Sequence, residues 1–172
     1  MFGLLKKLKK QPEYKLESKV FYSVETGILS NYFPYAADVH NYMIKTYDAE
    51  QCYVQYYFDA LTPVAVILWI DNWQSNLSEE ERLELFTVTG VPVTKKVHIL
   101  AFEVNKFLRK KGYGRAVLKH FVSDKEFVAI EAAENVEGFY RKCGFVIDKF
   151  SNYYFFVKGI APKKWDFVFK KD

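Results

Sequence analysis

A basic, glycine-containing segment most constrains the fold of this chain. It reads Arg109-Lys110-Lys111-Gly112-Tyr113-Gly114-Arg115 and follows an apolar run, Val97–Val104, that has the character of a strand. After it, four apolar residues recur at helical spacing: Val117, Leu118, Phe121 and Val122. Backbone N–H groups of such a loop, together with the N-terminus of a helix, attract anions. The sequence therefore predicts a strand, an anion-binding loop and a helix.

Two familiar phosphate-binding motifs do not fit this loop. The chain has no G-x-x-x-x-G-K-[ST] pattern here, and a third glycine for G-x-G-x-x-G is missing. What fits is Arg-x-x-Gly-x-Gly. Gly112 and Gly114 allow the backbone to approach a ligand without an intervening Cβ atom.

A second motif, downstream, reads Phe139-Tyr140-Arg141-Lys142-Cys143-Gly144-Phe145. With Arg-x-x-Gly-x-Gly before it, the segment from Val97 to about Lys158 resembles the GNAT N-acetyltransferase superfamily. The resemblance implies an α/β (α+β) fold with a mixed, strongly bent sheet of about seven strands flanked by helices. It also implies acetyl-CoA as cosubstrate, bound where the sheet splays beside Val104.

The resemblance also implies which residues hold the cofactor. Backbone groups of Phe102 and Val104 would pair with pantetheine, and the basic loop would cradle pyrophosphate. The full predicted cofactor set is Phe102, Val104, Arg109, Lys110, Lys111, Gly112, Tyr113, Gly114 and Arg115. The cationic side chains in this set suit phosphate groups.

Two residues of the Val97–Val104 strand are candidates for the general base. His98 titrates near neutral pH, and some family members place a catalytic carboxylate on the same strand. Glu103 is the alternative. Strand alternation places these two side chains on opposite faces, unless a β-bulge shifts the phase.

Tyr140 is the candidate general acid. It matches the tyrosine that in many family members reaches the thiol sulfur as coenzyme A leaves. One departure from the family pattern is Ala133, at a position where many relatives carry an asparagine that contacts coenzyme A. Asn135 is too close to Tyr140 in sequence to correspond to that asparagine of the family.

The first half of the chain shows a different set of patterns. Val20–Val24 is predicted as a first strand, and Cys52–Phe58 and Val64–Ile70 as an antiparallel pair. Residues 71–95 form an inserted segment with a capping box at Ser78–Glu81. Residues 1–12 form a basic helix or tail. In the second half, Phe127–Glu131 is a strand, Asn135–Lys142 a helix ended by Gly144, and Phe145–Ile147 and Tyr153–Lys158 a hairpin.

A helix is predicted from an N-cap at Asp38, with an apolar stripe at Val39, Tyr42, Met43, Thr46 and Tyr47. His40 lies beside this stripe, which predicts a surface position. The preceding aromatic segment, Tyr32–Tyr35, is expected to be irregular and either to face the substrate or to pack in the core.

Composition and length bound the remaining possibilities. The 172 residues predict one domain, and a hydrophobic content of 50% excludes a disordered chain. The longest apolar runs are too short to span a bilayer, and the two cysteines form no C-x-x-C pair, so a cytoplasmic chain is expected. The three histidines are scattered, which predicts no metal site. A net charge of +4 suits a polyanionic ligand.

The predicted function is N-acetylation of a primary amine by direct attack in a ternary complex. The acceptor class stays open: a small molecule, a peptide or an aminoacyl-tRNA. Two alternatives remain, namely a GNAT-fold toxin that acetylates aminoacyl-tRNA and a non-catalytic module that binds coenzyme A or a protein. A homodimer is compatible with each of them.

Overall fold

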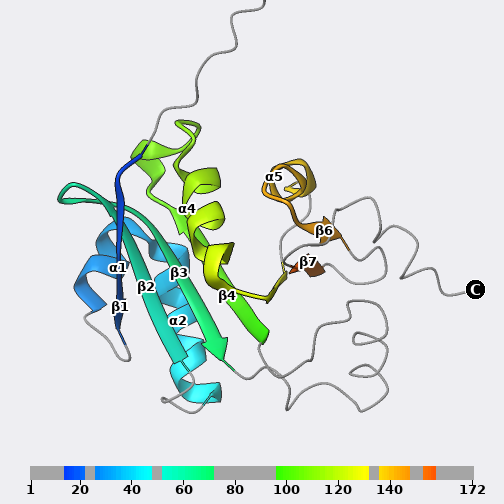
Figure 1. Cartoon of the computed structure of the whole chain (residues 1–172). Helices are drawn as coiled ribbons and strands as arrows, with labels where there is room; N and C mark the ends of the chain where they lie inside the picture. Colours follow the sequence, from blue (N-terminus) through cyan, green and yellow to red (C-terminus); the bar gives the residue numbers. More distant parts are fainter. Residues whose placement is uncertain are drawn as a thin grey trace, which may run out of the picture.

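A seven-stranded sheet forms the centre of the computed structural model of this chain (Figure 1). The structure describes residues 14–21, 26–47, 52–71, 96–131, 136–147 and 153–157. The strand order is β1-β2-β3-β4-β5-β7-β6, with bounds β1 Leu16–Phe21, β2 Cys52–Asp59, β3 Thr62–Asp71, β4 Lys96–Val104, β5 Phe127–Glu131, β6 Val146–Ile147 and β7 Tyr153–Val157. Neighbouring strands are antiparallel except β4 and β5, which are parallel. The predicted mixed sheet is confirmed.

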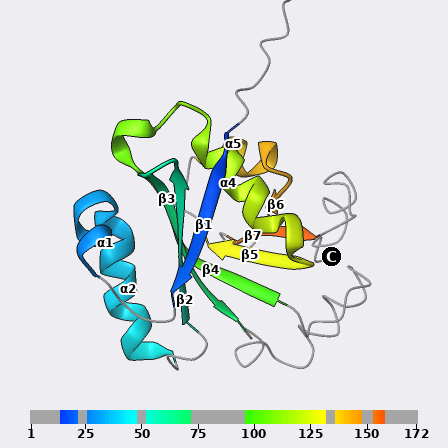
Figure 2. The same ribbon diagram turned by 60° about the vertical axis from the view of Figure 1, so that its left-hand side comes forward.

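Helices cover both faces of this sheet (Figure 2). α1 (Thr26–Tyr32) and α2 (Pro34–Thr46) pack on one face, and α4 (Tyr113–Phe121) and α5 (Glu137–Lys142) pack on the other. Two 3-10 helices, η4 (Lys106–Leu108) and η5 (Val122–Asp124), flank α4. Each face buries its own apolar cluster, so the sheet separates two cores.

The helix that follows the basic loop is as the sequence predicted. α4 buries Val117, Leu118 and Phe121, each at most 1% exposed, against the sheet. Burial of three large apolar side chains stabilises the position of the helix by several kcal/mol, at roughly 1.5–3 kcal/mol for each. The start of α4 is thereby fixed next to the end of β4.

β4 separates from β5 halfway along its length. The parallel pairing runs only from Lys96 to Ile99, opposite Phe127 to Ile130. From Ala101 to Val104, β4 pairs with β3 and with no other described strand. The splay that the sequence predicted beside Val104 is therefore present, and it leaves backbone groups of β4 facing an opening in the sheet.

A β-bulge in β4 decides which way its later side chains point. Leu68 of β3 pairs with Ala101, whereas the next residue, Trp69, pairs with Ile99. Leu100 is thus an extra residue on β4, and the alternation of faces restarts after it.

Because of this bulge, His98 and Glu103 lie on the same face of the sheet. The cross-strand partner of His98 is Ile70, and that of Glu103 is Val66. Both partners belong to the apolar cluster beneath α1 and α2. Simple alternation would have placed the two candidate bases on opposite faces.

The first strand differs from its prediction. β1 runs from Leu16 to Phe21 rather than over Val20–Val24, and residues 22–24 lie outside the described part of the chain. It is an edge strand, with every residue after Leu16 exposed. An exposed edge strand shows no alternation of apolar and polar residues. The sequence pattern therefore does not indicate that β1 begins at Leu16.

The helix expected after Asp38 also differs. α2 begins at Pro34, so Asp38 lies inside it, and the Tyr32–Tyr35 segment is helical except at Phe33. The buried face consists of Ala36, His40 and Met43, so the prediction that His40 lies on the surface is wrong. Tyr42, expected on the apolar stripe, is 60% exposed.

Other expectations are confirmed where the chain is described. The antiparallel pair is β2 and β3, and the second-half hairpin is β6 and β7. Gly144 has a φ of +91° after the last turn of α5. Several expectations concern parts of the chain outside the described residues. These parts are the basic segment 1–12, the 71–95 insertion beyond Asp71 with its capping box, Ala133, Asn135 and the C-terminal tail.

Candidate active site

A pocket of about 740 Å³ opens at the splay between β4 and β5. Its lining comes from the end of β4, the basic loop, the first turns of α4 and α2, and α5. The lining residues are Tyr35, Phe102, Glu103, Val104, Arg109, Lys110, Gly112, Gly114, Arg115, Val136, Phe139 and Tyr140.

No described helix is long and apolar enough to cross a membrane.

The pocket is lined from both faces of the sheet. Phe102, Val104 and Phe139 pack on the face covered by α4 and α5. Glu103 points to the opposite face, where its carboxylate meets the backbone of α2. Only an opening in the sheet allows one pocket to reach both sides, and the early end of the β4–β5 pairing provides that opening.

The basic loop has a backbone that few residues other than glycine adopt. Gly112, the N-cap of α4, has a φ of +93°, and Lys110 has a φ of +62°. A Cβ atom on Gly114 would lie 3.3 Å from side-chain atoms of Val104 and Phe139. Glycine therefore allows the first turn of α4 to lie close to β4, so that its free N–H groups face the pocket region.

The predicted cofactor residues divide into two groups. Seven of the nine line the pocket, including the three cationic residues Arg109, Lys110 and Arg115. Lys111 and Tyr113 do not line it. They contact other parts of the chain, which are described below.

Among the lining residues that the structure describes, Glu103 is the acidic one. It is 7% exposed, and its Oε2 accepts a hydrogen bond of 2.9 Å from the backbone N–H of Ala36. Its Oε1 lies 3.5 Å from the guanidinium of Arg109, which also donates to the carbonyl of Val104 at 3.3 Å. The carboxylate thus caps the N-terminus of α2 and remains at the pocket wall.

His98, the other candidate base, is placed elsewhere. It lies in the part of β4 that is paired with β5, and it does not line the pocket. The side chain is 7% exposed, and this burial lowers the pKa of His98 to about 4. The imidazole is therefore neutral at pH 7.

Tyr140 lines the pocket from the last turn of α5. The N–H of Phe145 donates to the carbonyl of Tyr140, and the N–H of Gly144 donates to that of Arg141. These two bonds form a Schellman motif, which ends the helix and turns the chain back. The ring of Tyr140 packs edge-on against Phe145 with centroids 5.6 Å apart and is 6% exposed. Its position is therefore fixed by the helix end.

Three lining residues were not in the predicted site set: Tyr35, Val136 and Phe139. Phe139 adjoins Tyr140 in the second motif, so the motif contained a signal for it. Its ring stacks on that of Phe102 with centroids 6.2 Å apart. Tyr35 is 57% exposed in the first turn of α2. It belongs to the aromatic segment Tyr32–Tyr35, for which the sequence predicts either contact with the substrate or packing in the core.

Neither cysteine has the properties of a nucleophile. Cys52 is buried in the core, and burial raises the pKa of the Cys143 thiol to about 11. Among the described residues, no three His, Cys, Asp or Glu side chains come together as metal ligands would. Among the described lining residues, the chemical groups at the pocket are thus one carboxylate, two phenols (Tyr35 and Tyr140) and three cationic side chains.

The bent mixed sheet, the β4–β5 splay and the glycine loop before α4 define the fold of the GNAT acetyltransferases. No protein-family model matches the chain, and no curated protein matches it in sequence. Solved structures do match. An acetyltransferase from Bacillus subtilis in complex with CoA is 14% identical, with a TM-score of 0.53 over 83% of this chain and 99% of that one.

Two further structures show the same likeness. The B. subtilis N-acetyltransferase YlbP, in complex with coenzyme A, is 13% identical with a TM-score of 0.51, over 84% of this chain and 99% of that one. A structure described as a bacterial toxin is 12% identical with a TM-score of 0.54, over 93% and 98%. At these identities the likeness shows the fold, and the predicted resemblance is confirmed at that level.

Proposed function

We propose that this protein is an acetyl-CoA-dependent N-acetyltransferase that joins an acetyl group to a primary amine by direct attack. The observation that carries the proposal is the pocket lined from both faces of the sheet. One face offers a loop of cations and free N–H groups, and the other offers a carboxylate. A donor and an acceptor can therefore meet in one pocket from opposite sides.

The cofactor end is supported by the loop and by β4. Arg109, Lys110 and Arg115 line the pocket beside the N-terminus of α4, an arrangement that suits a pyrophosphate. The backbone of β4 beyond Ile99 pairs with no described strand on the β5 side, so it can pair with the amides of pantetheine. Two solved proteins of this fold hold coenzyme A, which agrees with this assignment.

We place the general base at Glu103 and the general acid at Tyr140. Glu103 takes a proton from the acceptor nitrogen, which forms a bond to the acetyl carbon as the bond from that carbon to sulfur breaks. Tyr140 then donates its proton to the departing sulfur. Both side chains line the pocket, whereas His98 does not, and this is why the carboxylate is preferred.

A thiol-release assay with acetyl-CoA and a panel of amines tests the proposal. Glu103→Gln and Tyr140→Phe should each lower kcat about 10²-fold, because each removes one proton-transfer group. His98→Gln should retain most of the activity, since His98 lies outside the pocket lining. All variants need thermal unfolding curves, because Glu103 also caps α2.

The opposite pattern would contradict the assignment. If His98→Gln lost activity and folded Glu103→Gln kept it, the base would be the histidine. If no amine in the panel released thiol although coenzyme A bound, the alternative of a non-catalytic module would be favoured.

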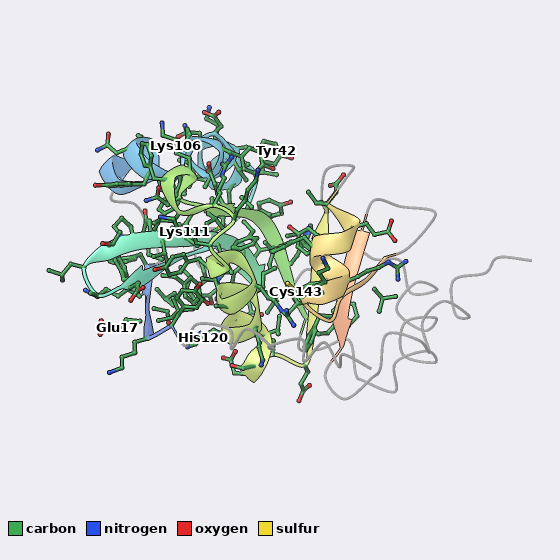
Figure 3. The ribbon with its side chains drawn as sticks, turned by 90° about the horizontal axis from the view of Figure 1, so that it is seen from above. Glu17, Tyr42, Lys106, Lys111, His120 and Cys143 are labelled. Carbon is green, nitrogen blue, oxygen red and sulfur yellow. The ribbon has the colours of Figure 1, made fainter. Side chains whose placement is uncertain are left out.

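A second candidate acceptor is an aminoacyl-tRNA, and one observation favours it. Phe107 is 71% exposed on η4 with the ammonium of Lys106 over its ring at 5.0 Å, and Tyr35 is exposed at the pocket. Aromatic and basic side chains together suit single-stranded RNA. Figure 3 shows Lys106 on the side that carries α1 and α2. One feature argues against this acceptor. The toxins that the chain resembles tend to carry an arginine on the fourth strand, and Ile99–Ala101 supplies none.

Transfer of radiolabelled acetyl groups separates the two acceptors. An enzyme for small amines should label free amines and leave charged tRNA unlabelled. An enzyme for aminoacyl-tRNA should do the reverse, and Phe107→Ala should then weaken tRNA binding.

A further inference from the structure

Two residues outside the pocket lining, Tyr14 and Asp59, contact the basic loop. Tyr14 lies two residues before the start of β1, and its hydroxyl donates a hydrogen bond to the carbonyl of Lys111, 97 residues away in sequence. Its ring lies against that of Tyr113, with centroids 4.3 Å apart. The hydroxyl of Tyr113 donates to Oδ2 of Asp59 at 2.5 Å. These contacts connect the loop to two neighbouring strands.

The strands bring these residues together by their register. Leu16 pairs with Asp59 at the end of the β1–β2 ladder, so Tyr14, two residues earlier, lies beyond the same end. Tyr113 is the first residue of α4, and its bond to Asp59 therefore fixes the start of that helix against β2. The hydrogen bond to the Asp59 carboxylate also raises the pKa of Tyr113 to about 12.

The bond from Tyr14 also orients a peptide plane. In a trans peptide the C=O and the next N–H point in opposite directions. The carbonyl of Lys111 points toward Tyr14, so the N–H of Gly112 points away from it. Tyr14 covers one side of Gly112, since a Cβ there would lie 2.9 Å from the Tyr14 hydroxyl, and Gly112 lines the pocket.

We propose that Tyr14, Tyr113 and Asp59 form a brace that holds the basic loop in its anion-binding conformation, and that they are positioning residues for the pyrophosphate of the cofactor. The brace turns the N–H of Gly112 toward the pocket and fixes the N-terminus of α4. Lys110 and Gly112 both have positive φ, a conformation that an unsupported loop would leave easily. The inference rests on the proposed cofactor site.

Calorimetric titration with coenzyme A itself tests the brace without any acceptor. Tyr14→Phe and Tyr113→Phe each keep the ring and remove one hydroxyl, so each should weaken binding about 3- to 10-fold, the effect of one hydrogen bond. Asp59→Asn, which keeps an oxygen acceptor, should retain more affinity than Asp59→Ala. The matched control is Tyr42→Phe, which removes the hydroxyl of an exposed tyrosine on α2 and should leave the affinity unchanged. Tyr42 lies on the opposite side of the sheet from α4, the helix of His120 (Figure 3).

Two further measurements separate positioning from general stability. Amide hydrogen exchange of Tyr14→Phe should rise in residues 109–115 and remain unchanged in β3. In the acetyl-transfer assay KM for acetyl-CoA should rise and kcat at saturation should hold. A fall in kcat with an unchanged KM would overturn the brace.

The failure of the brace and that of the proposed function give different results. If the parent protein binds coenzyme A and the Tyr14 and Tyr113 variants bind equally well, the brace is wrong and the cofactor site stands. If the folded parent protein binds no coenzyme A, the cofactor site is wrong and the brace falls with it.

Discussion

His98 shows how burial changes the titration of a residue. From sequence alone it was the more suitable base, because an unperturbed imidazole titrates near pH 6.5. In the folded chain, burial lowers the pKa of His98 to about 4. The residue therefore affects how stability depends on pH.

The stability of the fold should fall as the pH falls from 7 to 4. The unfolded chain takes up a proton at His98 near pH 6.5, whereas the folded chain resists protonation until about pH 4. Stability is therefore fully present above pH 6.5 and is lost below it, by roughly 3 kcal/mol at pH 4. Denaturant unfolding at several pH values measures this loss.

The comparison variant is His98→Gln, which removes the titrating group. Between pH 7 and pH 4 its free energy of unfolding should fall by roughly 3 kcal/mol less than that of the parent protein. Equal pH dependence in parent and His98→Gln would show that His98 is not protected from protonation.

At the scale of single elements, α5 and the turn that ends it hold two glycines in contrasting positions. Gly144 adopts a φ of +91° after the last turn, and a Cβ there would meet only ordinary contacts with Phe156. Gly138 lies in the first turn, where a Cβ would meet nothing within 4 Å. The first position needs glycine for its backbone and the second does not.

Alanine at these two positions should therefore change stability in opposite directions. Gly144→Ala should destabilise the protein by about 1 kcal/mol, because an L-residue disfavours the left-handed conformation. Gly138→Ala should stabilise it by about 0.5 kcal/mol through better helix propensity. Thermal unfolding measures both; a neutral Gly144→Ala would mean that α5 ends in another way.

The two major helices show how far sequence could predict the elements. α4 follows from local information: its buried stripe is at helical spacing and a glycine precedes it. The start of α2 does not, because the carboxylate at its N-terminus comes from Glu103 of β4, 67 residues away. The side chain at the N-cap, Phe33, makes no capping bond. Only the tertiary structure shows this cap.

The same limit applies to the candidate site. The loop and Tyr140 belong to two local motifs, and both line the pocket. The orientation of Glu103 depends on one extra residue, Leu100, whose bulge is defined by pairing with β3. Nothing in the strand's own sequence shows that register.

At the scale of the whole molecule, the pocket that passes through the sheet favours a sequential mechanism. Among the lining residues that the structure describes there is no cysteine or serine that could carry the acetyl group. Initial velocities with varied acetyl-CoA and amine should therefore give intersecting double-reciprocal lines. Parallel lines, with an acetylated enzyme in the mass spectrum, would contradict direct transfer.

The splay between β4 and β5 also affects how such a chain can diverge. If the cofactor is held by strand amides and helix N–H groups, most of its contacts use atoms that every amino acid possesses. Selection would then act mainly on backbone shape, at positions such as Gly112 and Gly114. Most of the remaining sequence could change while the site persisted. Identities of 12–14% to proteins of the same fold are what such freedom would produce.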